Sequence, residues 1–134
     1  LYNLEVICRE KAWGSFVRRY GSYIQQGARL PSLVEFTIKD DAREDPLITE
    51  DAVVALNILS EGAVKQIKQT TRKATEILRE HLSEKGLELI DIKFEFGEVN
   101  DKIVIIDEIS GDSMRVVKNG KVLLQKELYE EILS

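Results

Sequence analysis

The octapeptide Leu89-Ile90-Asp91-Ile92-Lys93-Phe94-Glu95-Phe96 alternates apolar and charged residues. Side chains of a β-strand point alternately to its two faces, so this stretch predicts a strand with one apolar and one charged face. We expect the apolar face to form a packing surface made of Ile90, Ile92, Phe94 and Phe96. The charged face is the first candidate for function, and it carries Asp91, Lys93 and Glu95.

The residues before this strand predict a long amphipathic helix. Ser60 is a typical N-cap and Gly86 a typical helix stop, and apolar residues recur at helical spacing over residues 61–85. The expected buried stripe consists of Val64, Ile67, Ala74, Ile77, Leu78 and Leu82. The sequence thus predicts a helix that leads directly into a strand over residues 87–96.

A second strand is expected to pair with the first as an antiparallel hairpin. Residues 97–101 predict the turn and residues 103–109 the partner strand. Glu95 and Asp107 then share a face only if the connecting loop has an odd number of residues, and a two- or four-residue loop puts them on opposite faces. On a shared face, the two carboxylates could hold Mg²⁺ against nucleotide phosphates, with Lys93 neutralising a transferred phosphoryl group. The alternative is a solvated strand face whose charges pair across strands.

The remaining segments complete an α+β pattern. Strands are expected over residues 4–9, 33–39, 114–118 and 121–125. The last two are joined by a tight turn at Asn119-Gly120. Short helices are expected over residues 16–20, 49–56 and 126–133. Ser15 and Thr49 are the expected N-caps of the first two helices, and Gly21 is the stop of the first. The order predicts a mainly antiparallel sheet packed against helices.

Composition excludes several classes of protein. The chain has 134 residues, of which 43% are hydrophobic and 32% charged, with 19 Lys+Arg against 24 Asp+Glu for a net charge of −5. It is therefore neither disordered nor membrane-like, and broad nucleic-acid binding is not expected. The single cysteine excludes an internal disulfide framework and a cysteine zinc cluster, which favours the cytoplasm. A chain that starts on Leu1 and directly in a strand suggests a piece of a longer protein.

Two arginines and a glycine-serine turn could form an oxyanion cradle. Arg9 and Arg115 offer bidentate guanidinium groups, and Gly14-Ser15 offers backbone N–H groups and a hydroxyl at a helix start. The alternative is that Ser15 only caps a helix and that arginines a hundred residues apart never meet. We expect Cys8 to be a small buried residue of the first strand and His81 to be a solvated residue of the long helix.

Four collinear blocks of the chain resemble the SAICAR synthetase (phosphoribosylaminoimidazole-succinocarboxamide synthase) family. Residues 89–97 resemble its signature of two hydrophobic residues followed by Asp, any residue, Lys, a hydrophobic residue, Glu, Phe and Gly. The other three blocks are residues 5–9 with 14–19, residues 39–42 with 45–48, and residues 107–110 with Asp112 and Arg115. One departure is Trp13, which stands where the family usually has alanine.

This resemblance implies a fold and a reaction. The fold would be similar to the larger second domain of SAICAR synthetase, described as ATP-grasp-like or kinase-like. The reaction would join L-aspartate to the carboxylated aminoimidazole ribotide (CAIR) in de novo purine biosynthesis, giving SAICAR, ADP and phosphate through an acyl phosphate. ATP and Mg²⁺ would be required, and a cytoplasmic homo-oligomer is expected. A kinase-like phosphotransferase and a non-catalytic ribotide-binding module remain as alternatives.

The resemblance also implies roles for individual residues. Glu95 and Asp107 match the carboxylates that hold Mg²⁺ and nucleotide, and Lys93 matches the lysine beside the phosphates. The groups that match the ribotide phosphate site are Arg9, Ser15 and Arg115. Two further acids, Asp91 and Asp112, match acidic residues near the imidazole. A loop near L-aspartate and CAIR is matched by Lys39, Asp41 and Asp45. We expect Lys93 and Asp91 to be catalytic.

The family's N-terminal ATP-binding lobe and its last helix have no counterpart in this sequence. Residues 1–134 are therefore expected to be the C-terminal substrate- and metal-binding domain of a longer enzyme. We expect this domain to be inactive in isolation.

Overall fold

A single antiparallel sheet organises the molecule. The structure, a computed structural model, describes residues 2–106 and 113–133. Within these ranges seven strands pair in the order β3-β2-β1-β4-β6-β7, and β5 pairs with β4 off this path. The strands are β1 (Leu4–Lys11), β2 (Arg29–Ile38), β3 (Leu47–Ile48), β4 (Glu88–Val99), β5 (Lys102–Ile105), β6 (Met114–Lys118) and β7 (Lys121–Val122). The predicted α+β class with a mainly antiparallel sheet is confirmed.

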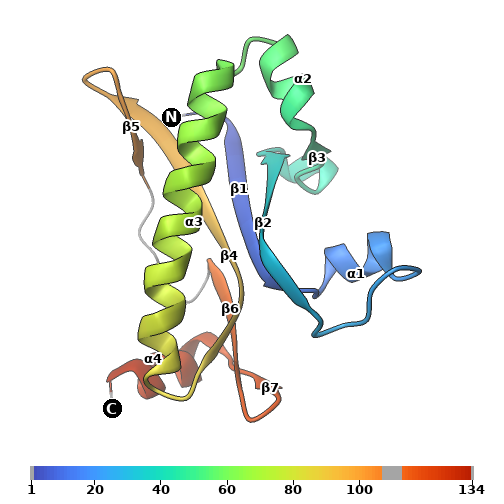
Figure 1. The fold of residues 1–134 in the computed structure, drawn as a ribbon, viewed down its shortest axis with the longest axis vertical. Coiled ribbons are helices and arrows are strands. Elements are labelled where there is room, and N and C mark those ends of the chain that lie inside the picture. Colours follow the sequence, from blue (N-terminus) through green and yellow to red (C-terminus); the bar gives the residue numbers. More distant parts are fainter. Residues whose placement is uncertain (1, 107–112, 134) are drawn as a thin grey trace.

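One long helix crosses the sheet on the side that faces the viewer in Figure 1. The helical elements are α1 (Ser15–Tyr20), the 3-10 turn η1 (Asp41–Arg43), α2 (Glu50–Ala55), α3 (Glu61–Ser83) and α4 (Gln125–Leu133). Both Thr49 and Ser60 accept a hydrogen bond from the backbone N–H three residues later, which confirms them as N-caps of α2 and α3. None of the helices in the described part of the chain combines the length and apolar character that a membrane crossing requires.

The apolar core lies between α3 and the sheet. Its large members from the sheet are Leu4, Val6, Phe36, Ile92, Phe94 and Phe96, and those from α3 are Val64, Ile67 and Leu82. Burying each such side chain stabilises the fold by about 1.5–3 kcal/mol. Cys8 is also fully buried here, as predicted.

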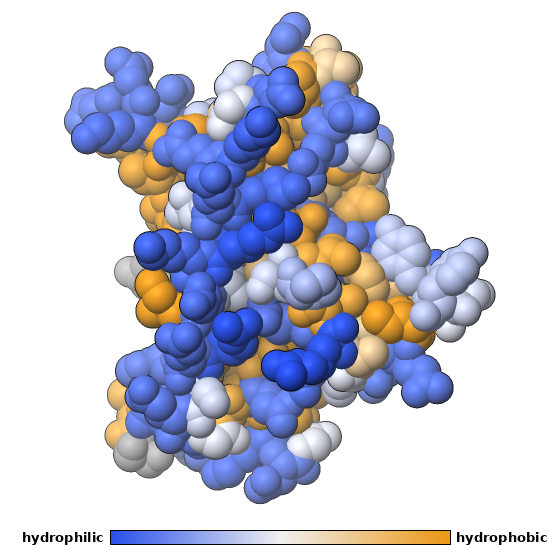
Figure 2. All heavy atoms as spheres, viewed as in Figure 1, coloured by the Kyte–Doolittle hydropathy of each residue, from blue (hydrophilic) through white to orange (hydrophobic). Residues whose placement is uncertain are grey.

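The outer side of α3 is hydrophilic along its length, as Figure 2 shows. His81 is exposed on this helix, as expected. The prediction that Ile77 belongs to the buried stripe is wrong, because Ile77 is 60% exposed. Successive residues of an α-helix are about 100° apart, and this rotation turns Ile77 away from the half-buried Leu78 beside it.

The β4–β5 hairpin turns over two residues. Val99 pairs with Lys102, so the loop consists of Asn100 and Asp101, which both adopt positive φ. The loop has an even number of residues, so the predicted hairpin with an odd loop, which would put Glu95 and Asp107 on one face, is wrong. Asp107 itself lies outside the described residues. A shared carboxylate site therefore depends on the family resemblance and no longer on hairpin register.

The segment around α1 differs from expectation at its start. Gly14, with φ of 55°, is the N-cap residue, and Ser15 is the first residue of the helix and makes no capping bond. Gly21 is the C-cap residue, in a right-handed conformation, so the predicted stop at Gly21 is confirmed. The predicted Ser15 cap is wrong because its hydroxyl is used elsewhere: it accepts a hydrogen bond from Arg9.

Strand β2 begins four residues earlier than predicted, at Arg29, and includes Pro31. The pairing of β1 with β2 shifts between Arg9 and Lys11, which leaves an irregular stretch of β2 opposite them. Proline has no N–H to donate to a ladder, and strand irregularities are where it is tolerated. The strand therefore continues through a proline that the sequence pattern assigns to a loop.

Candidate substrate site

The face of the sheet opposite the core carries charged residues in three rows. Directly paired residues of antiparallel strands share a face, and the registers of β2, β1, β4 and β6 align these rows. The first row is Thr37, Glu5 and Glu95; the second is Glu35, Ile7 and Lys93; the third is Leu33, Arg9, Asp91 and Arg115. Five of the eleven predicted site residues therefore lie on one surface: Arg9, Asp91, Lys93, Glu95 and Arg115.

Arg9 is the centre of the third row and is only 2% exposed. Its Nε donates to Glu35 Oε1 at 2.7 Å, its Nη1 to Asp91 Oδ2 at 3.3 Å, and its Nη2 to Ser15 Oγ at 3.1 Å. Burying a guanidinium is costly unless it is paired, and the two carboxylates supply that pairing. The predicted contact between Arg9 and Ser15 is present.

Asp91 joins the two distant arginines. Arg115 donates from Nε to Asp91 Oδ1 at 2.9 Å and from Nη2 to Oδ2 at 2.5 Å, a bidentate contact. Since Asp91 also accepts from Arg9, it bridges residues that are more than a hundred positions apart. The alternative in which Arg9 and Arg115 never meet is wrong.

Gly14 brings the α1 turn against Arg115. A Cβ atom built at Gly14 would lie 2.6 Å from Arg115 Nη1, and the φ of +55° is one that other residues adopt rarely. The backbone conformation, with φ of 55° and ψ of −127°, therefore favours glycine, and a larger residue would also displace the end of the Arg115 side chain. The Gly14-Ser15 turn and both guanidinium groups surround a cavity of about 320 Å³, lined among others by Arg9, Ser15, Asp91, Lys93 and Arg115.

The first row holds two acidic side chains close together. Glu95 accepts a hydrogen bond from Lys39 Nζ at 2.7 Å, and Glu5 Oε2 lies 3.6 Å from Lys93 Nζ. Burial raises the pKa of Glu5; Lys93 opposes this shift, whereas Asp45 and Glu95 add to it. Asp91 and Glu95 are 5% and 9% exposed, so these two acids are not solvated, but the cross-strand charge pairing of that alternative is present from Arg9 through Asp91 to Arg115.

Two buried polar atoms of this row accept or donate no hydrogen bond within the described residues: Glu5 Oε1 and Thr37 Oγ1. Both residues line a second cavity of about 480 Å³ that adjoins the first and shares Arg9, Ser15 and Lys93 with it. Unpaired buried polar atoms are costly, and the Glu5 carboxyl also lies within hydrogen-bond reach of the Asp45 carboxyl, which helps to raise its pKa. A cation or a shared proton would relieve both costs. Carboxylate and hydroxyl oxygens are ligands that suit Mg²⁺, so the donor set fits this ion.

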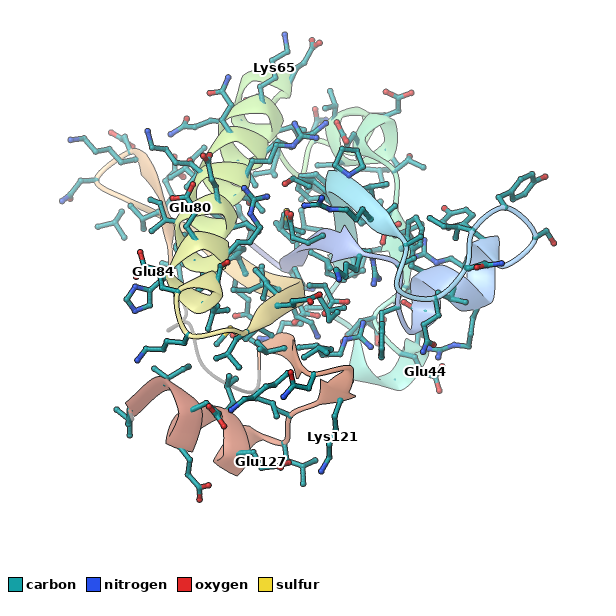
Figure 3. The ribbon with its side chains drawn as sticks, turned by 60° about the horizontal axis from the view of Figure 1, so that its bottom comes forward. Glu44, Lys65, Glu80, Glu84, Lys121 and Glu127 are labelled. Atoms are coloured by element: carbon teal, nitrogen blue, oxygen red, sulfur yellow. The ribbon has the colours of Figure 1, made fainter. Side chains whose placement is uncertain are left out.

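That cavity also includes the loop before β3. Asp45 lines it and accepts a hydrogen bond from the Asp40 N–H at 2.6 Å. Glu44, labelled in Figure 3, lines it from the same loop beside α1. The structure thus brings Asp45 and Lys39 to the site. The side chain of Asp41 and the whole of Asp107 and Asp112 lie outside what the structure describes.

No three acidic, histidine or cysteine side chains converge into a metal cluster among the residues that the structure describes. A complete magnesium site therefore needs ligands beyond these residues or from the substrates.

Sequence reasoning missed two acids of this surface, Glu5 and Glu35. A signal for Glu5 was available, because Glu5, Ile7 and Arg9 alternate along β1 and so share a face. Glu35 alternates with the apolar residues of β2 and so faces away from them, but nothing in its sequence neighbourhood indicates a partner. Its two arginine partners, Arg9 and Arg19, lie 26 and 16 residues away.

Comparison with known proteins gives a consistent result over the whole chain. Residues 1–130 match the family model described as SAICAR synthetase. A phosphoribosylaminoimidazole-succinocarboxamide synthase of Clostridium tetani is 48% identical over 133 residues, which cover 98% of this chain and 59% of that protein. The corresponding enzyme of Thermotoga petrophila is 42% identical over 136 residues, which cover 100% of this chain and 58% of that protein.

Solved structures give the same match. A SAICAR synthetase in complex with ADP superposes with a TM-score of 0.89 at 34% identity, covering 98% of this chain and 63% of that one. The SAICAR synthetase of Pyrococcus horikoshii gives a TM-score of 0.88 at 34% identity, covering 98% and 64%. The chain thus spans somewhat less than two thirds of these proteins, and its fold is the one expected from the resemblance. This chain belongs to the SAICAR synthetase family.

Proposed function

We propose that this chain is the substrate- and metal-binding domain of an ATP-dependent ligase that joins L-aspartate to CAIR, giving SAICAR, ADP and phosphate. Family membership and the charged face of the sheet support this proposal. The observation that carries it is the bridge from Arg9 through Asp91 to Arg115 beside Gly14-Ser15. Such a cluster provides fixed donors for a phosphate monoester, which CAIR carries and L-aspartate does not.

The ribotide phosphate binds between the two guanidinium groups and the Ser15 hydroxyl. Three N–H groups donate to no acceptor among the described residues: one on Arg9 Nη2 and both on Arg115 Nη1. These donors line the 320 Å³ cavity, which has room for a phosphate group. Asp91 keeps both arginines in place and prevents them from repelling each other.

The nucleotide phosphates lie toward the first row of the charged face. Glu95, with Asp107 by family resemblance, would hold Mg²⁺, and the Glu5 carboxylate could supply a further oxygen nearby. When bound, the ion neutralises phosphate charge during transfer. Lys93, whose side chain is 44% exposed, extends into both cavities and places its ammonium group beside the moving phosphoryl. The similar protein solved with ADP supports nucleotide binding in this family.

The reaction proceeds in two steps. The CAIR carboxylate oxygen attacks the γ-phosphorus of ATP, ADP leaves, and an acyl phosphate forms. The neutral aspartate amine then attacks the acyl carbon, phosphate leaves with the carboxylate oxygen, and the nitrogen gives one proton to the departing phosphate as the amide forms. By family resemblance, Lys39, Asp41 and Asp45 belong to a loop that binds L-aspartate and CAIR, and Asp45 lines the 480 Å³ cavity. Enclosure of this cavity by the missing part of the enzyme keeps water from the acyl phosphate.

The proposal is tested in a hybrid enzyme, in which this chain replaces the matching segment of the Clostridium tetani synthase. We expect ADP release that requires CAIR, L-aspartate and Mg²⁺ together, with SAICAR as the product. Loss of the aspartate requirement would favour a kinase-like phosphotransferase, and ribotide binding without turnover in a folded hybrid would favour a non-catalytic module. The 134-residue chain alone should bind ribotide without turnover. We also propose that the complete enzyme is a cytoplasmic homo-oligomer, which size-exclusion chromatography tests.

A further inference from the structure

Glu35 is a buried acid on the charged face that the proposed reaction does not use. It is 9% exposed, and its carboxylate accepts three hydrogen bonds from two arginines. Arg9 Nε donates to Oε1 at 2.7 Å, and Arg19 donates from Nη2 to Oε1 at 2.9 Å and from Nη1 to Oε2 at 2.8 Å. Both lone-pair regions of the carboxylate are therefore occupied by protein, so Glu35 has little capacity left for a ligand.

We propose that Glu35 is a positioning residue, which fixes the guanidinium plane of Arg9 so that Nη2 and Ser15 face the ribotide phosphate. This inference deepens the proposed function and rests on it. Glu35 does not touch the substrate in this role. It acts through Arg9, and Arg19 in turn holds Glu35 in place.

The geometry of a guanidinium group explains why two carboxylates are needed. The group is a flat fork whose N–H directions are fixed relative to one another, so contacts along two of its edges set its plane. Glu35 holds the Nε edge of Arg9, and Asp91 contacts Nη1 at the longer distance of 3.3 Å. Without Glu35 the shortest of the contacts on Arg9 is lost. Arg9 then keeps only the longer contacts of Nη1 with Asp91 and the Trp13 carbonyl and its stacking 5.5 Å from the Phe16 ring centroid. The direction of the Nη2 donor toward Ser15 is therefore set less tightly.

Arg19 provides the anchor for this arrangement. Its guanidinium lies 5.0 Å from the ring centroid of Tyr20 and 5.8 Å from that of Phe16, so stacking on α1 orients it before it meets Glu35. The result is a chain of alternating charges across the sheet: Arg19, Glu35, Arg9, Asp91 and Arg115. Three cations and two anions leave one net positive charge for an anionic ligand.

Glu35 is ionised in this setting. Burial acts to raise its pKa, but hydrogen bonds from Arg19 and Arg9 and their charges outweigh burial and lower the pKa below its ordinary value. A purely electrostatic role for this negative charge would oppose phosphate binding. Removing it would then strengthen ribotide binding, by about threefold for a screened charge several ångströms away. The positioning role predicts the opposite result, namely that removing the Glu35 charge weakens ribotide binding.

The experiment measures affinity for two probes that differ only in the phosphate. These are 5-aminoimidazole-4-carboxamide ribotide and the corresponding riboside, titrated by calorimetry into the 134-residue chain. The variants are Glu35→Gln, which removes the charge, and Glu35→Asp, which keeps the charge but is one methylene too short to bond both arginines at once. Circular dichroism and urea unfolding verify that each variant is folded.

Glu10→Gln is the matched control. Glu10 is also a buried acid of the sheet, 8% exposed, and it accepts hydrogen bonds from Ser32 at 2.5 Å and Arg79 at 2.9 Å. It lies on the opposite face of the sheet, toward α3, since its partner Arg79 belongs to that helix. Its substitution therefore removes a comparable buried carboxylate without touching the charged face.

We expect Glu35→Gln to weaken ribotide binding about tenfold and Glu35→Asp about fivefold, with riboside binding changed less than about twofold. The control should change neither by more than about twofold. Equal losses for both probes, an unchanged ribotide preference, or tighter ribotide binding in Glu35→Gln would overturn the positioning role. A wild-type chain that binds ribotide and riboside equally would instead overturn the proposed phosphate site, and the inference with it.

Discussion

The two faces of the sheet bury very different side chains. The face under α3 buries phenylalanine, isoleucine, leucine and valine side chains, whereas the opposite face buries Glu5, Arg9, Glu35, Asp91 and Glu95, each at most 9% exposed. Apolar burial stabilises the fold by about 25 cal/mol per Å². A buried ion pair often contributes less than the apolar residues that could replace it, because its desolvation is costly. The charged face is thus explained by ligand binding better than by stability.

This difference predicts that substitutions on the two faces have separable effects. Variants of the α3 face should change the unfolding free energy and leave ligand binding intact. Variants of the charged face should change ligand binding or turnover, and Glu35, which bonds two arginines, should affect stability as well. The predictions below test this separation, from the largest expected effect to the smallest.

The largest effect is expected in the core, from Phe94→Ala. Phe94 is 2% exposed and packs in the cluster under α3, so its truncation leaves a cavity. The free energy of unfolding should fall by about 4 kcal/mol, measured by urea denaturation. A fall below 1 kcal/mol would mean that this face does not carry the stability.

Glu95→Gln in the hybrid enzyme should lower Mg²⁺-dependent turnover at least about a hundredfold, because only the ligand charge changes. The free energy of unfolding should change by less than about 1 kcal/mol, since the amide still accepts a hydrogen bond from Lys39. Initial rates of ADP release and urea curves measure the two quantities. Near-normal turnover would contradict the metal role of Glu95.

Arg115→Ala should raise the KM for CAIR about thirtyfold in the hybrid enzyme, because a bidentate phosphate donor is lost. The KM for ATP should change far less, since Glu95 and Lys93 remain. Steady-state kinetics with each substrate varied in turn provide the comparison. An equal rise in both KM values would count against the phosphate assignment.

Glu35→Gln should lower the free energy of unfolding by about 2 kcal/mol at neutral pH, because Arg9 loses a charged partner. The folded-state pKa of Glu35 is lowered, so its contribution is present above the unfolded-state pKa and is lost as pH falls through the folded-state pKa. Wild type and variant should therefore converge in acid. Urea unfolding between pH 3 and pH 7 tests this, and a difference that is independent of pH would exclude the ion pair as its cause.

The smallest effect is expected at a helix end. Ser60 Oγ accepts a hydrogen bond from the Ala63 N–H at 3.1 Å, so Ser60→Ala should lower the unfolding free energy by about 1 kcal/mol. Ligand binding should be unaffected, because α3 covers the other face. Any loss of ribotide affinity in this variant would show that the two faces are coupled.

Local sequence patterns were sufficient to predict most of the individual strands and helices. The alternation over residues 89–96 predicted β4 and its charged face, and Ser60 and Thr49 predicted two helix starts. These signals depend on neighbours within a few residues, where backbone geometry and capping bonds decide the conformation. They failed at Ser15, whose hydroxyl is bound by an arginine from another element rather than by its own helix.

The sequence by itself determined the strands, the long helix, the acidic and basic residues of the charged face, and the family likeness. Only the tertiary structure decided which of these residues meet: Asp91 between Arg9 and Arg115, Glu35 between Arg9 and Arg19, and Glu5 beside Lys93. The reason is that strand register and strand order bring together segments up to about a hundred residues apart, and no local propensity encodes that pairing. The two-residue turn at Asn100-Asp101 is one example, because the alternation of β4 fits either an odd or an even loop.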